Sequence, residues 1–293
     1  MQPSGSAANT SDISDTDLPR LMGVWAHPDD ECFGSAGTMA RAVASGHPVA
    51  VVSATRGEKG KIADPSLATQ ENLGAVRERE LRAACAAVGV SDVAFLDYVD
   101  GHLAAANADE AVGRIVRQVR RFRPDVVITF APNGGYGHVD HTAIHRYTLA
   151  AISAAADPTR YPEQIAAGLR PHRVRKVYYG AMPRRRLLAM REEMQKQGRD
   201  FVPGGDEATI PVERMGTPDE DITTRIVLND AEFAAKRRAM AAHATQMPAD
   251  SPWADATPEQ LRQFMGVEQF QLVAPPASDR AYPTPEESVF AGL

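Results

Sequence analysis

The stretch Leu21-Met22-Gly23-Val24-Trp25-Ala26-His27-Pro28-Asp29-Asp30-Glu31 joins an uninterrupted apolar run to a histidine and three carboxylates. A short apolar run that ends in turn-forming residues is typical of a buried strand. A second such run, residues 126–130, precedes the polar cluster Tyr136-Gly137-His138-Val139-Asp140-His141. Zinc and similar metals bind imidazole nitrogen and carboxylate oxygen, and a catalytic site uses three protein ligands plus water. The two clusters therefore suit a mononuclear metal hydrolase.

Around these clusters, short β-like runs alternate with stretches of helical periodicity. The runs cover residues 21–26, 48–55, 93–97 and 125–130, and the helical patterns cover 35–45, 68–88 and 109–122. This alternation predicts an α/β fold with an open, mostly parallel sheet and helices on both faces. In a strand order 3-2-1-4, the first and fourth strands are neighbours, and ligands bind outside their carboxyl ends. Both polar clusters are then expected at one edge of the sheet.

The rest of the chain is expected to complete this domain with a C-terminal α+β extension. A helix (141–156), a strand (174–182), a strand (222–228), a helix (230–245) and a late strand (269–273) are predicted. Between 183 and 221 the periodicity weakens, which indicates an irregular insertion, either a loop over the active site or a small hairpin. Its basic run, residues 184–186, is typical of a solvated face. We expect one domain over 18–293.

Composition excludes several classes of protein. Of the 293 residues, 43% are hydrophobic and 24% charged, as in ordinary globular chains, and the net charge of −6 offers no attraction for nucleic acid. Two cysteines form no disulfide framework, which favours a reducing cytoplasm. Residues 1–17 are polar and predict a disordered tail. No apolar run approaches the roughly 20 residues of a membrane span, so no membrane partner is expected. The sequence does not decide whether the chain forms a homo-oligomer.

The first cluster divides into a ligand pair and a base. His27 and Asp30 are three residues apart, so one helical turn places both on one side, where they could share a metal. Asp29 points elsewhere, free to take a proton from a water whose pKa the metal lowers toward about 7. Glu31 is a candidate to support a ligand histidine from behind. The plainer alternative is an Asp-rich turn that caps a helix starting near Ser35.

The second cluster offers three histidines. His138, His141 and His145 have spacings of three and four, so two share a helix face, but the spacing does not select the ligand. The Gly-rich segment 133–137 suits either a phosphate-binding nest or a tight turn that positions Tyr136. The first strand is not followed by G-x-G-x-x-G, which argues against a dinucleotide cofactor.

Together, residues 26–31 (AHPDDE) and 137–141 (GHVDH) resemble the PIG-L/LmbE-like family, zinc-dependent N-deacetylases of acetylated amino sugars with a Rossmann-like fold. Weaker resemblance runs through residues 55–60, 76–81, 100–101 and 243–246, so it covers the chain from about 21 to 246. Val139 stands where the family often has proline, which should alter loop stiffness more than chemistry.

This resemblance implies zinc ligands at His27, Asp30 and His141, with Asp29 as the general base. Another divalent metal such as Fe²⁺ is an alternative to zinc.

The resemblance further implies that His138 stabilises the oxyanion and is oriented by Asp140, and that Tyr136 acts on the tetrahedral intermediate. It implies sugar binding by Arg77 and Asp100. The plain alternative for Arg77 is a surface pair with Glu80 on the same helix.

We therefore expect a hydrolase that removes an acetyl group from an N-acetylglucosamine-type sugar or its conjugate. One alternative is an amidase that cleaves a thiol-sugar conjugate. Another is a non-catalytic sugar- or nucleotide-binding module, which would not need Asp29 beside the ligands. Arg77 and the insertion are expected to select the substrate. His243 is expected either to interact with its helix dipole or to close the pocket, and Glu58 either to face the pocket or to be a solvated acid.

Overall fold

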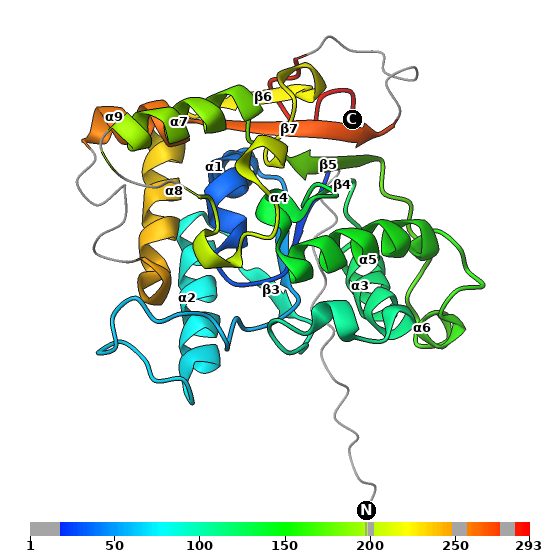
Figure 1. The fold of residues 1–293 in the computed structure, drawn as a ribbon. Coiled ribbons are helices and arrows are strands. Elements are labelled where there is room, and N and C mark those ends of the chain that lie inside the picture. The colour runs from blue at the N-terminus through cyan, green and yellow to red at the C-terminus, as the bar shows by residue number, and fades with distance from the viewer. Residues whose placement is uncertain (1–17, 197, 199–201, 248–256, 276–284) are drawn as a thin grey trace, which may run out of the picture.

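The computed structural model describes residues 18–196, 198, 202–247, 257–275 and 285–293; the predicted tail, 1–17, lies outside them. Within the described residues, seven strands form one sheet in the order β3-β2-β1-β4-β5-β7-β6 (Figure 1). The strands are β1 (Leu21–Trp25), β2 (Val49–Ser53), β3 (Asp92–Phe95), β4 (Val126–Thr129), β5 (Lys176–Gly180), β6 (Thr224–Val227) and β7 (Val267–Ala274). Strands β1 to β5 are parallel, and β7 runs antiparallel to both of its neighbours, β5 and β6, so the predicted fold class and the order 3-2-1-4 are confirmed.

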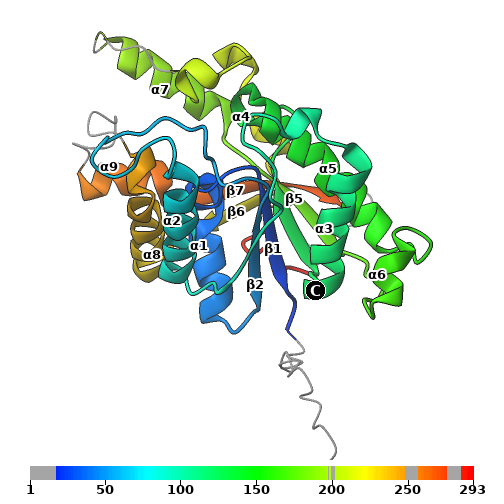
Figure 2. The same cartoon turned by 90° about the horizontal axis from the view of Figure 1, so that it is seen from below.

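Helices cover both faces of the sheet (Figure 2). On one face pack α1 (Asp30–Ala44), α2 (Leu73–Ala87) and α8 (Asp230–Ala242), and on the other α3 (Ala108–Phe122) and α5 (Val139–Ala155). Successive strand residues point to opposite faces. In β1, Leu21 and Trp25 accordingly join the first core, and Met22 and Val24 join the second. A strand buried on both faces explains the uninterrupted apolar run.

Shorter elements connect these layers. They are α4 (Gly134–Gly137), α6 (Pro162–Ala166), α7 (Arg184–Lys196), α9 (Pro258–Met265) and the 3₁₀ turns η1 (Leu103–Ala105), η2 (Gly205–Glu207), η3 (Val212–Arg214), η4 (Asp219–Asp221) and η5 (Ala244–Gln246). The predicted N-cap Asn229 of α8 forms a full capping box with Glu232. Among the helices of the described residues, none is long and apolar enough to cross a bilayer.

Two expectations about helices were wrong. The first helix begins at Asp30 rather than near Ser35. The segment expected to be a loop or small hairpin contains α7, in which Leu187 is the one residue buried among those described. A helix that is polar nearly all round shows no apolar stripe, so its periodicity is not visible in the sequence. Its arginines are not all solvated, since Arg184 donates to the carbonyl of Met215 and Arg186 to that of Phe264.

The sheet brings the two polar clusters together. Strands β1 and β4 are parallel neighbours, with Leu21 opposite Val126 and Gly23 opposite Ile128. The carboxyl end of β1 leads into residues 26–31, and that of β4 leads through α4 into residues 138–141. Both clusters therefore lie at the same edge of the sheet, at the point where the strand order reverses.

Candidate metal and catalytic site

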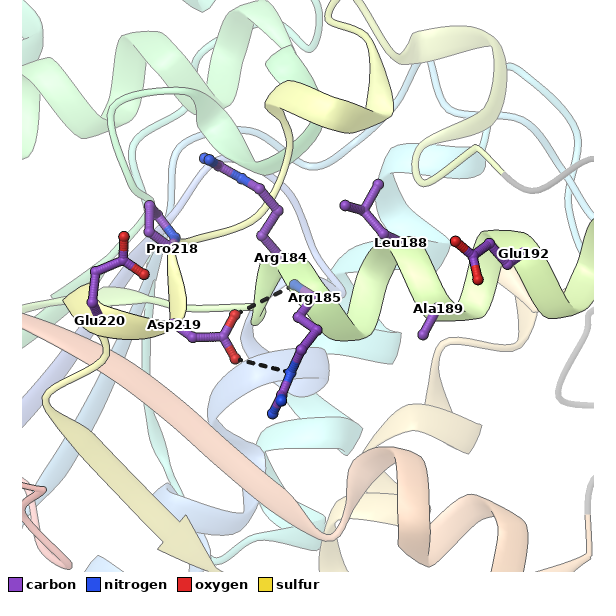
Figure 3. Close-up of a pocket in the computed structure, with 8 residues that line it drawn as sticks. All are labelled: Arg184, Arg185, Leu188, Ala189, Glu192, Pro218, Asp219 and Glu220. Carbon is purple, nitrogen blue, oxygen red and sulfur yellow. Dashed lines mark hydrogen bonds and ion pairs between the residues drawn. The ribbon is translucent and has the colours of Figure 1, made fainter.

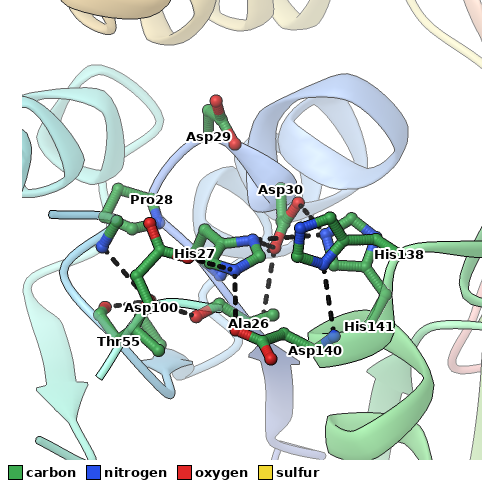
Figure 4. A network of polar contacts seen from close by, with 12 residues as sticks. Ala26, His27, Pro28, Asp29, Asp30, Thr55, Asp100, His138, Asp140 and His141 are labelled. Carbon is green, nitrogen blue, oxygen red and sulfur yellow. Dashed lines mark hydrogen bonds and ion pairs between the residues drawn. The ribbon is translucent and has the colours of Figure 1, made fainter. Parts of the chain in front are cut away.

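The turn from β1 into α1 fixes the first cluster. Asp29 precedes the helix with φ 101° and ψ −28°, a left-handed conformation that non-glycine residues rarely adopt. Such outliers cluster at functional sites. Asp30 begins the helix, and its Oδ2 accepts hydrogen bonds from the backbone N–H groups of Ala26 at 3.2 Å and His27 at 2.8 Å. The Asp30 carboxylate is therefore fixed against the end of β1, while Asp29 points away from it (Figure 4).

A glycine-rich turn places the second cluster. Gly134, Gly135 and Gly137 all have positive φ, and a Cβ on Gly134 would lie 2.9 Å from the Cβ of His141. The backbone thus passes too close to His141 for any side chain at position 134. His138 follows as the N-cap of α5, and its Nδ1 accepts the N–H of Asp140 at 3.2 Å. The segment makes a tight turn that presents both histidines to the first cluster.

Three side chains from these segments bring their potential metal-ligating atoms close together. His27 Nδ1 lies 3.3 Å from His141 Nε2, and that nitrogen lies 3.3 Å from Asp30 Oδ1. His27 Nδ1 is 3.7 Å from Asp30 Oδ2. Ligands at 2.0–2.1 Å from a tetrahedral zinc ion stand about 3.4 Å apart. The three side chains therefore fit a divalent metal in both donor type and spacing.

Hydrogen bonds behind the two histidines orient their free lone pairs. His141 Nδ1 donates to the carbonyl of Gly134 at 3.1 Å, which leaves Nε2 as the acceptor. His27 Nε2 lies 3.0 Å from Asp100 Oδ1 and 3.3 Å from Asp140 Oδ2, so it donates to these carboxylates and leaves Nδ1 free. Ligand histidines in metal sites are held in this way. Phe130 also stacks on the His141 ring at 3.9 Å between centroids.

Two other combinations of donors lie close to His27 and suit a metal less well. Donor atoms of His27, Asp100 and Asp140 lie within 4.8 Å of one another. However, Asp100 accepts the N–H of Lys59, and Asp140 accepts those of Gly101 and Leu103, so both carboxylates are already used as acceptors.

His138, His27 and His141 form the second combination. Because His138 Nδ1 accepts a backbone N–H, the neutral ring carries its proton on Nε2. It is therefore a donor rather than a ligand.

The carboxylates around His27 favour its charged form. Burial opposes the charge, but the hydrogen bonds to Asp100 and Asp140 and the charge of Asp30 outweigh it and raise the pKa of His27 to about 10. Burial and the charge of His27 hold the pKa of His141 well below its ordinary value. Metal binding at His27 Nδ1 must therefore release a proton.

Asp29 has the properties of a base. Burial raises its pKa from 3.8 to about 7, although the positive charge of Arg77 works in the opposite direction. The Arg77 guanidinium lies 3.3 Å from Asp29 Oδ2. A general base works best when its pKa lies near the working pH.

His138 and Tyr136 both offer donors near the three ligand atoms. The His138 ring lies 4.7 Å from that of His141, and burial and the charge of His27 lower its pKa, which favours the neutral ring. Asp140 contacts His138 through its backbone N–H, while its carboxylate contacts His27 and backbone N–H groups, so the orientation of His138 by Asp140 stays a prediction. The Tyr136 ring lies 5.1 Å from His141, and burial raises the pKa of its hydroxyl.

Arg77 and Asp100 contact protein groups in the structure. Arg77 is 4% exposed and donates to the carbonyls of Pro28 at 2.6 Å and Gly57 at 2.8 Å. The alternative surface pair with Glu80 is wrong, because Glu80 accepts hydrogen bonds from Thr245. Asp100 is occupied by His27 and the N–H of Lys59.

Two acids and a histidine support the site from behind. Glu31 was expected to support a ligand histidine, but its carboxylate instead contacts the N–H of Asp29 and the ring of His243. Glu31 is buried, and its Oε2 accepts the N–H of Asp29 at 2.9 Å. His243 is also buried and lies 2.7 Å from Glu31 Oε1, so it packs beneath the turn and does not close a pocket. Glu58 Oε1 accepts the N–H of Asp100 at 2.9 Å, so it is not a solvated loop acid. The contacts of His243 and Glu58 join residues far apart in the sequence, so no local pattern could predict them.

Part of the insertion lies against the turn that carries Tyr136. Thr209 donates to the carbonyls of Tyr136 at 3.1 Å and Gly137 at 2.6 Å, and Gly204 contacts the Tyr136 ring closely. A separate open groove lies between α7 and residues 218–220, where Arg185 contacts Asp219 (Figure 3). Its lining residues all belong to the insertion and none belongs to the His/Asp cluster. This groove is therefore separate from the His/Asp cluster.

Comparison with known proteins gives consistent results. The model of the family PIG-L, described as GlcNAc-PI de-N-acetylase, matches residues 22–152. Proteins from Streptomyces avermitilis and Thermobispora bispora, both named 1D-myo-inositol 2-acetamido-2-deoxy-alpha-D-glucopyranoside deacetylase, are each 37% identical to this chain. The match to the Streptomyces protein covers 94% of this chain and 99% of that protein. The match to the Thermobispora protein covers 87% of this chain and 88% of that protein.

Solved structures share the fold at low identity. An N,N'-diacetylchitobiose deacetylase from Pyrococcus horikoshii is similar with a TM-score of 0.65 at 19% identity, over 88% of this chain and 84% of that one. GalB from Pseudomonas putida, a 4-carboxy-2-hydroxymuconate hydratase, is similar with a TM-score of 0.58 at 18% identity, over 90% and 100%. One fold thus carries different reactions, so the chemistry must be argued from the site.

Proposed function

The chain belongs to the PIG-L family, and we propose that it removes the N-acetyl group from an acetylated glucosamine linked to inositol. The observation that carries this proposal is the convergence of His27 Nδ1, His141 Nε2 and the Asp30 carboxylate, with separations of 3.3–3.7 Å. A metal-dependent amide hydrolase needs such a centre together with an adjacent base. The similarity to the two actinobacterial deacetylases supports the choice of substrate.

We propose that His27, Asp30 and His141 hold a zinc ion, because two imidazole nitrogens and one carboxylate leave an open fourth position in a tetrahedral site. When bound, the metal supplies Lewis acidity and lowers the pKa of water. The same donor set also accepts Fe²⁺. Asp100 and Asp140 keep the His27 ring in the orientation that presents Nδ1.

Asp29 takes the proton of the attacking water. Burial raises the pKa of its carboxyl to about 7, so the carboxylate is about half ionised at neutral pH and is the main form above it. Arg77 contacts both the Asp29 carboxylate and the carbonyl of Pro28, so it positions the base. Once protonated, Asp29 returns this proton to the leaving amine.

His138 stabilises the oxyanion of the tetrahedral intermediate. Its Nδ1 accepts the N–H of Asp140, so the neutral ring donates through Nε2. A donor that meets developing charge lowers the barrier more than it strengthens substrate binding. Tyr136 stays protonated, because burial raises its pKa, and supplies a second donor beside the insertion.

Substrate selection is assigned to the insertion. Residues 204–209 contact the turn that carries Tyr136 and His138, next to the proposed centre. The family resemblance also implied a sugar-binding role for Arg77 and Asp100. Their contacts here instead support a role in positioning Asp29 and His27.

A substrate panel tests the function. We would incubate zinc-loaded protein with N-acetylglucosaminyl inositol, free N-acetylglucosamine, N,N'-diacetylchitobiose and an acetylated thiol-sugar conjugate, and measure free amine. We expect the inositol conjugate to give the highest kcat/KM, with Asp29→Asn as the inactive control. Release of amine from the thiol conjugate alone would favour the amidase alternative, and no release from any of them would refute the proposal.

A further inference from the structure

A second group of buried side chains contacts the backbone of Asp29. Glu31, Cys32 and His243 are each no more than 2% exposed, and their donor atoms lie within 4.8 Å of one another. A metal is not the best explanation for this group. Cys32 Sγ donates to the carbonyl of Asp29 at 3.0 Å, and burial raises the pKa of the thiol well above its ordinary value. A metal would need the thiolate.

The group instead holds both backbone polar groups of Asp29, its N–H and its carbonyl. The N–H of Asp29 donates to Glu31 Oε2 at 2.9 Å. Its carbonyl accepts from the N–H and the Sγ of Cys32, both at 3.0 Å. Asp29 has φ 101°, which an L residue keeps only when its surroundings hold it there.

His243 connects this turn to a distant helix. It lies at the C-terminal end of α8, and its Nε2 lies 2.7 Å from Glu31 Oε1. The segment that follows is anchored to α2, because the N–H and hydroxyl of Thr245 donate to Glu80 at 2.8 and 2.6 Å. Each oxygen of Glu31 is therefore committed, one to His243 and one to Asp29.

We propose that His243 is a positioning residue that fixes Glu31, so that Glu31 holds Asp29 in the left-handed conformation from which its carboxylate acts as the base. His243 is buried and acts only through Glu31. The role of Asp29 as a base rests on the proposed function. The hydrogen-bonded chain from His243 through Glu31 to the Asp29 N–H does not.

The same helix offers a matched control. Lys236 of α8 is buried and lies 2.9 Å from Glu268, which accepts the N–H groups of Gly37 and Thr38 in α1. Like His243, it links α8 to α1 through a buried carboxylate. It does so further along α1, and within the described residues it forms no hydrogen bond with the turn at Asp29.

The test compares His243→Gln, His243→Asn and Lys236→Met in the metal-loaded protein. Glutamine keeps an N–H at the position of Nε2, whereas asparagine is too short to reach Glu31. A misplaced catalytic group costs up to about 100-fold in rate. We expect His243→Asn to lose about 10- to 100-fold in kcat with KM within about threefold and bound metal unchanged. We expect His243→Gln and Lys236→Met to stay within about threefold of the wild-type kcat.

Hydrogen exchange gives a readout that does not depend on turnover. Amide exchange in residues 26–32 should be faster in His243→Asn than in the wild type, and unchanged in His243→Gln and Lys236→Met. Equal losses of activity in the Gln and Asn variants, an equal loss in Lys236→Met, a change in KM alone, or unchanged exchange would each overturn the proposal. If the wild type hydrolyses no acetylated sugar, the proposed function fails, and the exchange pattern still decides the role of His243.

Discussion

Replacing Asp29 by asparagine should inactivate the protein and also stabilise it. The side chain keeps its shape but can no longer take a proton. Loss of a general base typically lowers the rate by about 10²–10⁴-fold. The bound metal should remain, because the Asp29 carboxylate lies against Arg77 and the proposed ligands are His27, Asp30 and His141.

The gain in stability follows from the pKa of Asp29. The folded protein raises this pKa from 3.8 to about 7, so the folded state holds the proton more tightly than the unfolded chain does. The stabilising contribution of the protonated carboxyl is present in full below pH 3.8 and is lost as pH rises through about 7. A difference of about three pKa units corresponds to about 4 kcal/mol at most. The Asp29 side chain is 21% exposed, and solvent screening reduces the expected effect to about 2–4 kcal/mol.

The assay is urea unfolding of the metal-free wild type and variant at pH 4, 6 and 8. We expect the difference in free energy of unfolding, Asp29→Asn minus wild type, to become more positive as pH rises, by about 2–4 kcal/mol between pH 4 and pH 8. Asp221→Asn, at an exposed position, controls for the loss of one negative charge. A difference between variant and wild type that stays constant with pH would refute the assigned environment of Asp29. A variant that keeps its activity would refute its role as the base.

Three further predictions concern the neighbours of Asp29. Asp30→Ala and His141→Ala should each lose the bound metal, measured by elemental analysis after dialysis, and full retention in either would remove that residue from the ligand set. His138→Ala should lower kcat by about 10²–10³-fold and change KM little, whereas a change in KM alone would make it a substrate-binding residue. Arg77→Met should lower the free energy of unfolding by about 2–4 kcal/mol, because it removes the charged hydrogen bonds to the carbonyls of Pro28 and Gly57, of which, among the described residues, only that of Gly57 keeps a second donor, the N–H of Gly60. It should also reduce kcat by the same factor for free N-acetylglucosamine and for the inositol conjugate, and a larger loss with the conjugate would restore its role in specificity.

Sequence patterns predicted the sheet and the meeting of its two polar clusters because both depend on local signals. Apolar runs mark β1 and β4, and the strand order makes them neighbours. Within residues 27–30 and 138–141 the candidate metal ligands are three residues apart, so each pair lies on one helical turn. Helix α7 had no such signal, since a helix that is polar nearly all round has no apolar stripe.

The contacts behind the site depend on segments far apart in the chain. Arg77 reaches the carbonyl of Pro28 across 49 residues, and His243 reaches Glu31 across 212. No sequence pattern in either segment predicts its partner, because these contacts form only when α2 and α8 pack beside α1. The family resemblance implied a sugar contact for Asp100, whereas in the structure this carboxylate contacts His27.

Anomalous diffraction at the zinc edge, from crystals of the zinc-loaded protein, tests the proposed centre most directly. We predict one strong peak about 2.0–2.2 Å from His27 Nδ1, His141 Nε2 and an oxygen of Asp30. A peak on the other side of the His27 ring, between Asp100 and Asp140, would contradict the ligand assignment. A peak among Glu31, Cys32 and His243 would contradict it equally and would also remove the positioning role of His243.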